Sequence, residues 1–312
     1  MQKNYIILAH RNPKQLARMI DKLDDGQAYF YIHLDLRVKI DDFQKEISKP
    51  NVFFIPKREE CFWGDFSIVK ATLNLMEAVR NDNRKGFVIL MSGQDYPIKN
   101  QMEIDEFLSY NEDFNFIEIT PIEEKWKKKM AKDKVFHYHI LHSSKRSDSN
   151  SYAPFFHTDI KQKIRILIHF LKGRLSFKNL KKLLQLPERK PIFPKQYAGS
   201  QWWAFNEQTF QKLFFYLQEN KEDLENYYRF TSSPDEIFFH SVLMHLQESD
   251  AEIKIKPSVT YVNWDRKGCQ LPVLFQSSDL QELEQQKDKL FARKFDVEID
   301  SEIFNLLDET NG

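Results

Sequence analysis

A chain of 312 residues with 41% hydrophobic residues and 27 phenylalanines can bury a substantial core, which excludes an intrinsically disordered protein. Eight glycines and twelve prolines are too few for a collagen-like or linker-rich chain. The 46 basic residues balance 46 acidic ones, but residues 125–195 hold nineteen Lys or Arg and only four Asp or Glu. This basic block indicates either a surface for an anionic partner or a solvated insertion.

Strands and helices alternate over the first 120 residues. Short apolar runs predict strands at 5–9, 29–35, 52–55 and 86–91. Apolar residues at helical spacing predict helices over 16–23 and 66–79. The alternation predicts an α/β fold with a mostly parallel central sheet flanked by helices. Ligands of such sheets bind beyond the carboxyl ends of the strands, where His10, Asp35 and the segment 92–95 fall.

The pattern changes between residues 124 and 195, where we expect a basic amphipathic helix over 160–171. Ordered patterning then resumes and predicts a strand at 201–205, a helix over 208–220, a helix from Pro234, short strands at 254–257 and 259–262, and a helix over 279–290. No run of eighteen apolar residues occurs, which argues against a membrane-spanning helix. The apolar run at the N-terminus is too short for a secretory signal.

The two cysteines, Cys61 and Cys269, lack the spacing of a zinc site or a redox pair, so we expect a cytoplasmic protein. Gly-x-Gly-x-x-Gly, Walker-type and Gly-x-Ser-x-Gly motifs are absent. The predicted strand 29–35 ends in a single acid, Asp35, followed by Arg37 where a metal-binding Asp-x-Asp would have its second acid. Because a cation cannot ligate a metal, this pattern argues against a bound metal. A structural turn fits the lone acid equally well.

Glu236 has two interpretations. Ser233, Pro234 and Glu236 match a helix capping box, worth about 1 kcal/mol of stability. Alternatively, a carboxylate fixed at a helix start could take a proton from a hydroxyl group. The local pattern favours the cap, in which the Glu236 side chain points to its own backbone rather than into a cleft.

The segment 290–296 carries two adjacent cations between Phe291 and Phe295, which could anchor it while one cation faces inward. Lys294 could bind a phosphate as a mobile point charge. A basic helix C-terminus favoured by the helix macrodipole is the equal alternative.

Seven segments occur in an order that resembles the core-2/I-branching β-1,6-N-acetylglucosaminyltransferase and peptide O-xylosyltransferase family, glycosyltransferase family 14. They are Ala9-His10, His33-Leu-Asp35, Trp63, Ser92-Gly-Gln-Asp-Tyr-Pro-Ile-Lys99, Gly199-Ser-Gln-Trp-Trp203, Ser233-Pro-Asp-Glu236 and Leu290-Phe-Ala-Arg-Lys-Phe-Asp296. The resemblance runs from about residue 5 to residue 300, with the basic middle unmatched.

The resemblance implies a GT-A-type fold, inverting chemistry, a UDP-sugar donor and no metal or other cofactor. It implies that Glu236 is the catalytic base. Residues implied to bind the nucleotide sugar are His10, Asp35, Lys294 and, as a second diphosphate cation, Arg266 or Lys267. Residues implied to line the donor or acceptor cleft are Trp63, Asp95 and Trp203.

We therefore expect one catalytic domain over residues 1–312, with a nucleotide-binding half (1–122), a basic insertion facing the acceptor or a membrane (123–195) and an acceptor and catalytic half (196–312). Animal members carry a membrane anchor and several disulfides, so this chain resembles a bacterial member. It would transfer N-acetylglucosamine, or as second choice xylose, to a glycan or lipid-linked oligosaccharide in surface polysaccharide synthesis. Peripheral contact with the inner face of an anionic membrane is expected, and contact with nucleic acid is not. The alternative is a non-catalytic protein that binds a polysaccharide or nucleic acid through the basic segment.

Overall fold

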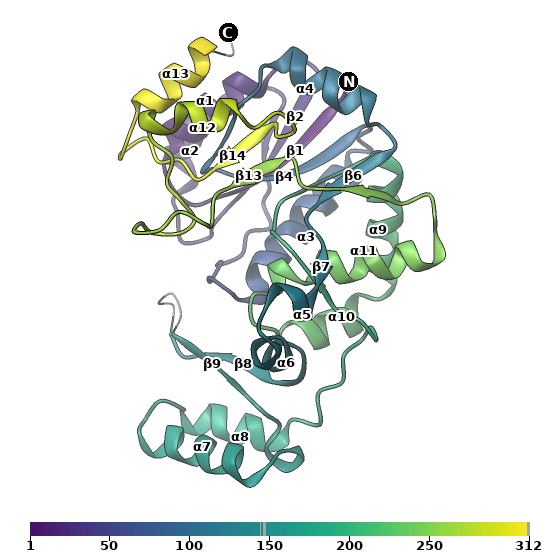
Figure 1. Cartoon of the computed structure of the whole chain (residues 1–312), viewed down its shortest axis with the longest axis vertical. Coiled ribbons are helices and arrows are strands. Elements are labelled where there is room, and N and C mark those ends of the chain that lie inside the picture. The colour runs from purple at the N-terminus through teal and green to yellow at the C-terminus, as the bar shows by residue number, and fades with distance from the viewer. Residues whose placement is uncertain (144, 146–147, 311–312) are drawn as a thin grey trace.

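A seven-stranded sheet with the order β12-β6-β11-β4-β1-β2-β3 forms the centre of the computed structural model, which describes residues 1–143, 145 and 148–310 (Figure 1). Four neighbouring strands are parallel: β1 (Lys3–Ala9), β2 (Ala28–Leu34), β3 (Val52–Phe54) and β4 (Phe87–Ser92). β11 (Trp203–Phe205) runs antiparallel between β4 and β6 (Phe114–Ile117), and β12 (Lys254–Lys256) is parallel to β6. The predicted α/β fold with a mostly parallel sheet is confirmed.

Alternate side chains of the strands enter two cores, one on each face of the sheet. On β1, Tyr5 and Ile7 belong to one core and Ile6 belongs to the other, as the period of two residues in a strand requires. The first core is covered by α1 (Pro13–Leu23), α2 (Ile40–Glu46), α4 (Gln101–Tyr110) and α13 (Glu302–Thr310). The second is covered by α3 (Phe66–Asn81), α9 (Glu207–Glu219), α10 (Lys221–Tyr228) and α11 (Phe238–Ser249).

A second, three-stranded sheet joins β13 (Thr260–Val262), β14 (Phe291–Arg293) and β5 (Asp95–Pro97). It brings the C-terminal motif beside the turn that follows β4. The helix predicted over 279–290 is wrong in extent: a 3₁₀ turn at Ser277–Asp279 leads into the short α12 (Leu280–Glu284). The reason is tertiary, because the backbone of Leu290 donates to Val259 and accepts from Ile98.

The helix predicted to begin at Pro234 also differs. Pro234–Glu236 form a 3₁₀ turn, and α11 starts only at Phe238. Ser233 has a left-handed backbone (φ 51°), and its side chain makes no capping hydrogen bond. The capping-box interpretation of Ser233 and Glu236 is therefore wrong.

Residues 123–195 form a lobe below the sheet (Figure 1), and Ala131, Val135 and Phe193 pack its base into the second core. Its elements are α5 (Ile122–Lys125), α6 (Lys128–Phe136), the hairpin of β8 (Tyr138–Leu141) and β9 (Ser149–Tyr152), α7 (Ile160–Leu171) and α8 (Phe177–Gln185). The basic helix predicted over 160–171 is confirmed. A third core, which includes Tyr138, Tyr152, Ile166, Leu183 and Phe230, holds α7 and α8 on the hairpin.

Arg189 ties the base of this lobe to the rest of the chain. The guanidinium is 4% exposed and donates to the carbonyl oxygens of Lys134 and His137 (both 2.7 Å) and Tyr227 (3.0 Å), and to the hydroxyl of Thr231. It also lies 4.2 Å from the ring centroid of Tyr227. Burial lowers the pKa of Arg189, and the tyrosines around it only partly offset this effect. The two short strands β7 (Thr120–Pro121) and β10 (Tyr197–Ala198) pair where the chain enters and leaves the lobe.

Candidate active site

The carboxyl ends of β1, β2 and β4 meet at one edge of the sheet. The amide of Asp35 donates to the carbonyl of Ala9 (2.9 Å), and the amide of Gly93 donates to the carbonyl of Leu8 (3.0 Å). His10 follows β1 directly. Burial lowers the pKa of His10, as do the charges of Arg11, Lys294 and Arg293, while Asp35 opposes them. Three residues predicted to bind the nucleotide sugar, His10, Asp35 and Lys294, are thus electrostatic neighbours.

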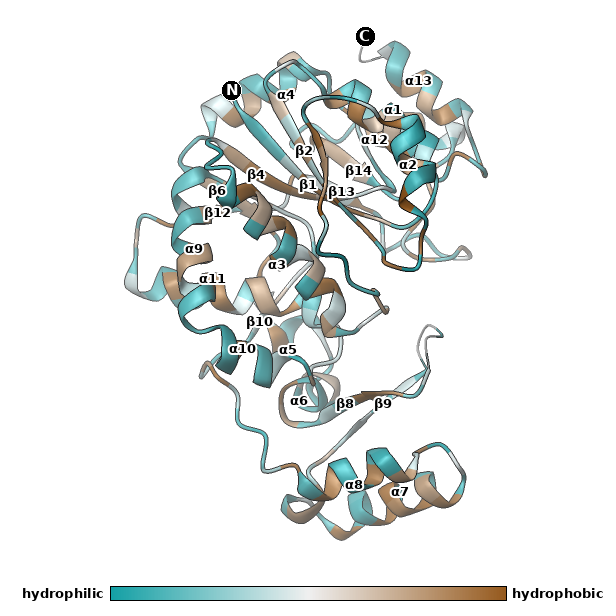
Figure 2. Cartoon of the chain, turned by 180° about the vertical axis from the view of Figure 1, so that it is seen from behind, coloured by the Kyte–Doolittle hydropathy of each residue, from teal (hydrophilic) through white to brown (hydrophobic). Residues whose placement is uncertain are grey.

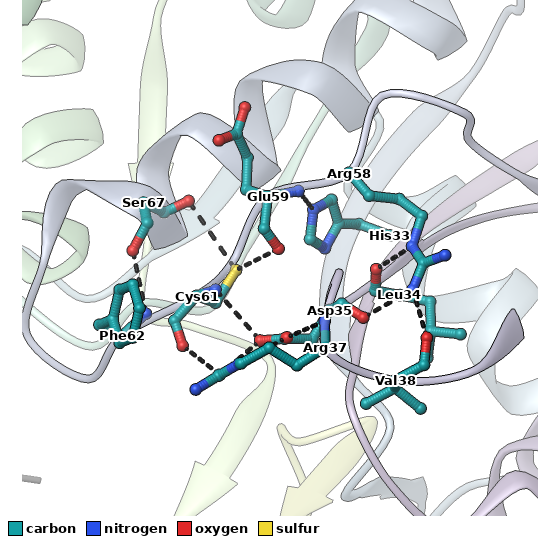
Figure 3. A network of polar contacts seen from close by, with 10 residues as sticks. All are labelled: His33, Leu34, Asp35, Arg37, Val38, Arg58, Glu59, Cys61, Phe62 and Ser67. Carbon is teal, nitrogen blue, oxygen red and sulfur yellow. Dashed lines mark hydrogen bonds and ion pairs between the residues drawn. The ribbon is translucent and has the colours of Figure 1, made fainter. Parts of the chain in front are cut away.

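Both carboxylate oxygens of Asp35 accept hydrogen bonds from the protein (Figure 3). One oxygen accepts from the backbone amide (3.0 Å) and Nε (2.8 Å) of Arg37, and the other accepts from Nη2 of Arg37 (2.7 Å) and the amide of Cys61 (3.1 Å). Burial alone would raise the pKa of Asp35, but these four hydrogen bonds outweigh it and lower the pKa. Because a carboxylate offers about four acceptor positions, a direct contact from Asp35 to a nucleotide does not fit this arrangement. Asp35 instead fixes Arg37 and the loop that follows β3.

The loop that follows β3 is held on the sheet by two further side chains (Figure 3). Nε2 of His33 accepts from the amide of Glu59 (2.8 Å), so the imidazole must be neutral at that nitrogen. Burial lowers the pKa of His33 to about 4. Arg58 donates to the carbonyls of Leu34 and Asp35, each at 2.7 Å, and so fixes the turn after β2.

Asp95, predicted to line the cleft, is 0% exposed and cannot contact a ligand in this structure. Its carboxylate accepts from the amide (2.8 Å) and hydroxyl (2.9 Å) of Ser92 and from Nη1 of Arg293 (2.7 Å). Burial raises the pKa of Asp95, and Arg293 opposes that effect. The guanidinium of Arg293 also lies 4.3 Å from the ring centroid of Trp202. Arg293 is therefore the inward-facing cation of the motif, a role the sequence did not assign to either residue.

Lys294 is the next residue, and its main chain is fixed on both sides. Its amide donates to the carbonyl of Val273 (3.2 Å), and its carbonyl accepts from the amide of Phe275 (2.8 Å). Phe291 and Phe295 are both 0% exposed, which confirms that they anchor the segment. The alternative of a basic helix C-terminus is wrong, because the motif lies on strand β14 and the turn after it.

Asp296 closes the motif against the start of α1. Its carboxylate accepts from Arg11 and from Nδ2 of Asn12 (2.9 Å). Gln15 adds a second link, since its Nε2 donates to the carbonyls of Gly93 (3.0 Å) and Phe295 (3.3 Å). These bonds hold the turn at residue 294 beside the end of β1.

Glu236 lies in the 3₁₀ turn before α11, close to two lysines of the basic lobe. Lys134 is 7% exposed and its Nζ donates to the carbonyl of Ser232 (2.9 Å), while Lys125 donates to the carbonyl of Gly199. Burial lowers the pKa of both lysines, and the negative charges of Glu236 and Asp235 oppose it. The sequence missed these lysines, because neither stands out within the basic block.

Asp235 precedes Glu236 in the same 3₁₀ turn, and both acids are half-buried. The Oδ1 atom of Asp235 is buried and has no hydrogen-bond partner among the residues that the structure describes. Burial, and next the charge of Glu236, raise the pKa of Asp235, so the pair favours holding one negative charge rather than two.

Two segments connect the strand-end cluster to the Glu236 turn. In the loop after β3, Cys61 donates to Asp35, and three residues later the carbonyl of Gly64 accepts from the amide of Ser233 (2.9 Å). In the segment 199–202, Gly199 donates to the carbonyl of Glu236 (3.0 Å), and Trp202 stacks on Arg293. Each of these two segments therefore contacts the strand-end cluster at one residue and the Glu236 turn at another.

Two of the residues predicted to line the cleft, Trp63 and Trp203, differ in exposure. Trp63 is 53% exposed and immediately precedes Gly64, beside the Glu236 turn. Trp203 is 1% exposed and stacks on Phe205 (4.2 Å) in the core, so the prediction that it lines a cleft is wrong. Trp202, the residue before β11, is also buried (6% exposed) and is the tryptophan that contacts Arg293.

The two residues suggested as the second diphosphate cation lie after β13. Arg266 forms ion pairs with Asp279 (2.8 Å) and Glu282 (2.6 Å), which already balance its charge. The hydrogen bonds that Arg266 donates to these acids raise the pKa of Arg266. Lys267 is exposed.

Over the described part of the chain, no group of three or more His, Cys, Asp or Glu side chains is arranged to hold a metal ion. Over the same residues, no helix is both long and apolar enough to cross a bilayer.

Comparison with known proteins identifies the family. The profile of the Core-2/I-Branching enzyme family matches residues 4–285. This chain belongs to that family. It is 26% identical over 326 residues to a xylosyltransferase of Ciona intestinalis, with 97% of this chain and 33% of that protein covered. Human xylosyltransferase 2 is 25% identical over 328 residues, with the same coverage, and human xylosyltransferase 1 is 24% identical over 324 residues, with 97% and 30% covered. The chain thus spans about a third of the length of these relatives.

The match confirms the resemblance seen in the motifs. The matched range encloses all of residues 123–195, the basic lobe.

Proposed function

We propose that the protein is an inverting, metal-independent glycosyltransferase. It moves N-acetylglucosamine or xylose from a UDP-sugar to a hydroxyl group of a glycan or lipid-linked oligosaccharide, at the cytoplasmic side of bacterial surface polysaccharide synthesis. The observation that carries the proposal is that two segments, the loop after β3 and residues 199–202, contact both the Glu236 turn and the strand-end residues Asp35 and Arg293. The family relatives named xylosyltransferases support the reaction class.

The proposed roles follow from the charges. Lys294 balances the negative charge that develops on the departing UDP, with Lys267 as the remaining candidate for the second cation because Asp279 and Glu282 already balance Arg266. Glu236 accepts the proton of the acceptor hydroxyl while its oxygen forms a bond to the anomeric carbon and the bond from that carbon to the UDP oxygen breaks. One base suffices, because the displacement passes through no covalent sugar–enzyme intermediate.

Metal independence rests on the strand end. A divalent cation there would need a carboxylate with free lone pairs, and the Asp35 carboxylate accepts four hydrogen bonds from Arg37 and Cys61. We expect UDP release from the correct donor to proceed in the presence of EDTA. A strict requirement for added Mg²⁺ or Mn²⁺ would contradict this part of the proposal.

Glu236→Gln tests the base. It keeps the shape of the side chain and removes its ability to accept a proton, so turnover should fall by about 100-fold to 10,000-fold. Binding of UDP, measured by calorimetry, should change by less than about twofold, because the diphosphate cations are intact. Glu248→Gln, an exposed acid on α11, is the matched control. A Glu236→Gln variant with most of its turnover would remove Glu236 from the mechanism.

A further inference from the structure

Helix α7 carries an apolar stripe on its solvent side. Its five members recur at i, i+4, i+7, i+8 and i+11, which places them within about 100° of one helix face. They are Ile160 (68% exposed), Ile164 (49%), Leu167 (45%), Ile168 (41%) and Leu171 (82%). The opposite flank of the helix holds it on the protein, since Ile166 and Phe170 pack into the third core. The apolar stripe is therefore not needed to attach α7 to the lobe.

Two more exposed aromatic residues flank the helix. Phe156, in the 3₁₀ turn before α7, is 66% exposed, and Phe177, at the start of α8, is 72% exposed. The ring of Phe177 lies 6.5 Å from that of Phe170 on α7. Figure 2 shows apolar residues along both α7 and α8 at the end of the molecule farthest from the sheet.

Positive charge surrounds the apolar stripe. Residues 159–182 contain eight Lys or Arg and one Asp. At 100° per residue, Lys161 and Lys163 fall on opposite borders of the stripe. The pKa of Lys182 on α8 is lowered by burial and then by the charges of Arg229 and Lys178, so cations in this region repel one another.

The combination of charge and apolar surface selects the partner. A nucleic acid or an anionic glycan would match the cations but has nothing to cover five exposed aliphatic side chains. A second copy of the chain would cover them but would bring eight cations against eight. We propose that α7 docks the protein on an anionic phospholipid bilayer, with the apolar stripe at the headgroup–acyl boundary and the bordering lysines among the headgroups.

The lobe would then hold the Glu236 turn at a defined distance from the bilayer. The β8–β9 hairpin, which lies between α7 and the rest of the molecule (Figure 1), is attached next to that turn, because the amide of His139 donates to the carbonyl of Phe230 (2.8 Å) and Lys134 binds the carbonyl of Ser232. Such an arrangement suits a lipid-linked acceptor. That last step rests on the proposed function, whereas the docking itself does not.

Vesicle flotation of the full chain tests the docking, with vesicles of phosphatidylcholine alone or mixed with phosphatidylserine. We expect partition onto the mixed vesicles only, with a strong decrease at high salt. The Lys161→Gln/Lys163→Gln variant should lose about fivefold for each lysine. The Leu167→Ser/Leu171→Ser variant should lose at least about tenfold.

Phe215→Ser is the matched control, because Phe215 is 65% exposed on α9, outside the lobe, and should bind like the parent chain. Thermal unfolding by circular dichroism checks that each variant folds. Equal partition onto neutral and mixed vesicles, or wild-type partition of the Leu167→Ser/Leu171→Ser variant, would overturn the proposal. So would self-association that depends on the apolar stripe without any vesicle binding, since the partner would then be a second copy.

Discussion

Gly199 allows the closest backbone approach in the site, and Gly199→Ala should disrupt it. A Cβ atom at this position would lie 1.6 Å from the carbonyl oxygen of Glu118 and 2.8 Å from the ring of His240. Since non-bonded atoms need roughly 3.5 Å, the backbone would have to move by about 2 Å. Gly199 also donates to the carbonyl of Glu236 at 3.0 Å, so the displacement would reach the proposed base.

We expect Gly199→Ala to lose about 1–3 kcal/mol of unfolding free energy through overpacking. Turnover should fall on the order of 100-fold, because a misplacement of about 1 Å has that effect on a positioned catalytic group. Thermal denaturation and UDP release measure the two effects. Gly93→Ala is the stability control, because its Cβ would meet Ala9 at 3.4 Å, an ordinary contact. A Gly199→Ala variant with the parent melting temperature and turnover would refute the reasoning.

Two further predictions concern UDP binding and pH. Lys294→Met should weaken UDP binding about 10-fold to 100-fold, the usual value of a hydrogen bond to a charged group. Lys267→Met should weaken UDP binding only about twofold to fivefold, because an exposed charge is screened. An unchanged UDP affinity of Lys294→Met, measured by calorimetry, would contradict the first prediction. His33 has a pKa of about 4 in the folded protein against 6.5 ordinarily, so the unfolded chain takes up the proton first as pH falls. Protonation of His33 thus leaves the free energy of unfolding unchanged above about pH 7 and lowers it between pH 6.5 and 4, by up to roughly 3 kcal/mol. In His33→Gln this decline should be shallower, and identical pH slopes in urea unfolding would contradict the assignment.

The sequence predicted the parts of the fold that depend on local pattern. The apolar runs of β1, β2 and β4 and the helical spacing of α7 are strong signals, and the placement of His10 and Asp35 at the strand ends followed from a general property of parallel sheets. The predicted helix over 279–290 ended early, because the main chain of Leu290 bonds to Val259 and Ile98, which are distant in the sequence. Hydrogen bonds to residues distant in the sequence cannot be predicted from the local sequence pattern.

The burial of individual side chains in the site was the hardest property to predict from the sequence. Trp202 and Trp203 are adjacent, chemically identical and both buried in the second core, yet Trp202 contacts Arg293 whereas Trp203 stacks on Phe205. Asp95 was correctly placed after β4, but its full burial depends on Arg293, about two hundred residues later in the chain. The lysines near Glu236 were missed for the same reason.

The position of Arg189 bears on how the basic lobe can vary. The guanidinium grips carbonyl oxygens at the base of the lobe, on the side next to the Glu236 turn, and α7 and α8 lie beyond it. A lineage could therefore lengthen, shorten or recharge the segment between β9 and Arg189 while the turn stays in place, provided that the replacement still covers Tyr138, Tyr152 and Phe230. Changes in this segment could therefore alter the surface to which the protein binds while the Glu236 turn keeps its structure.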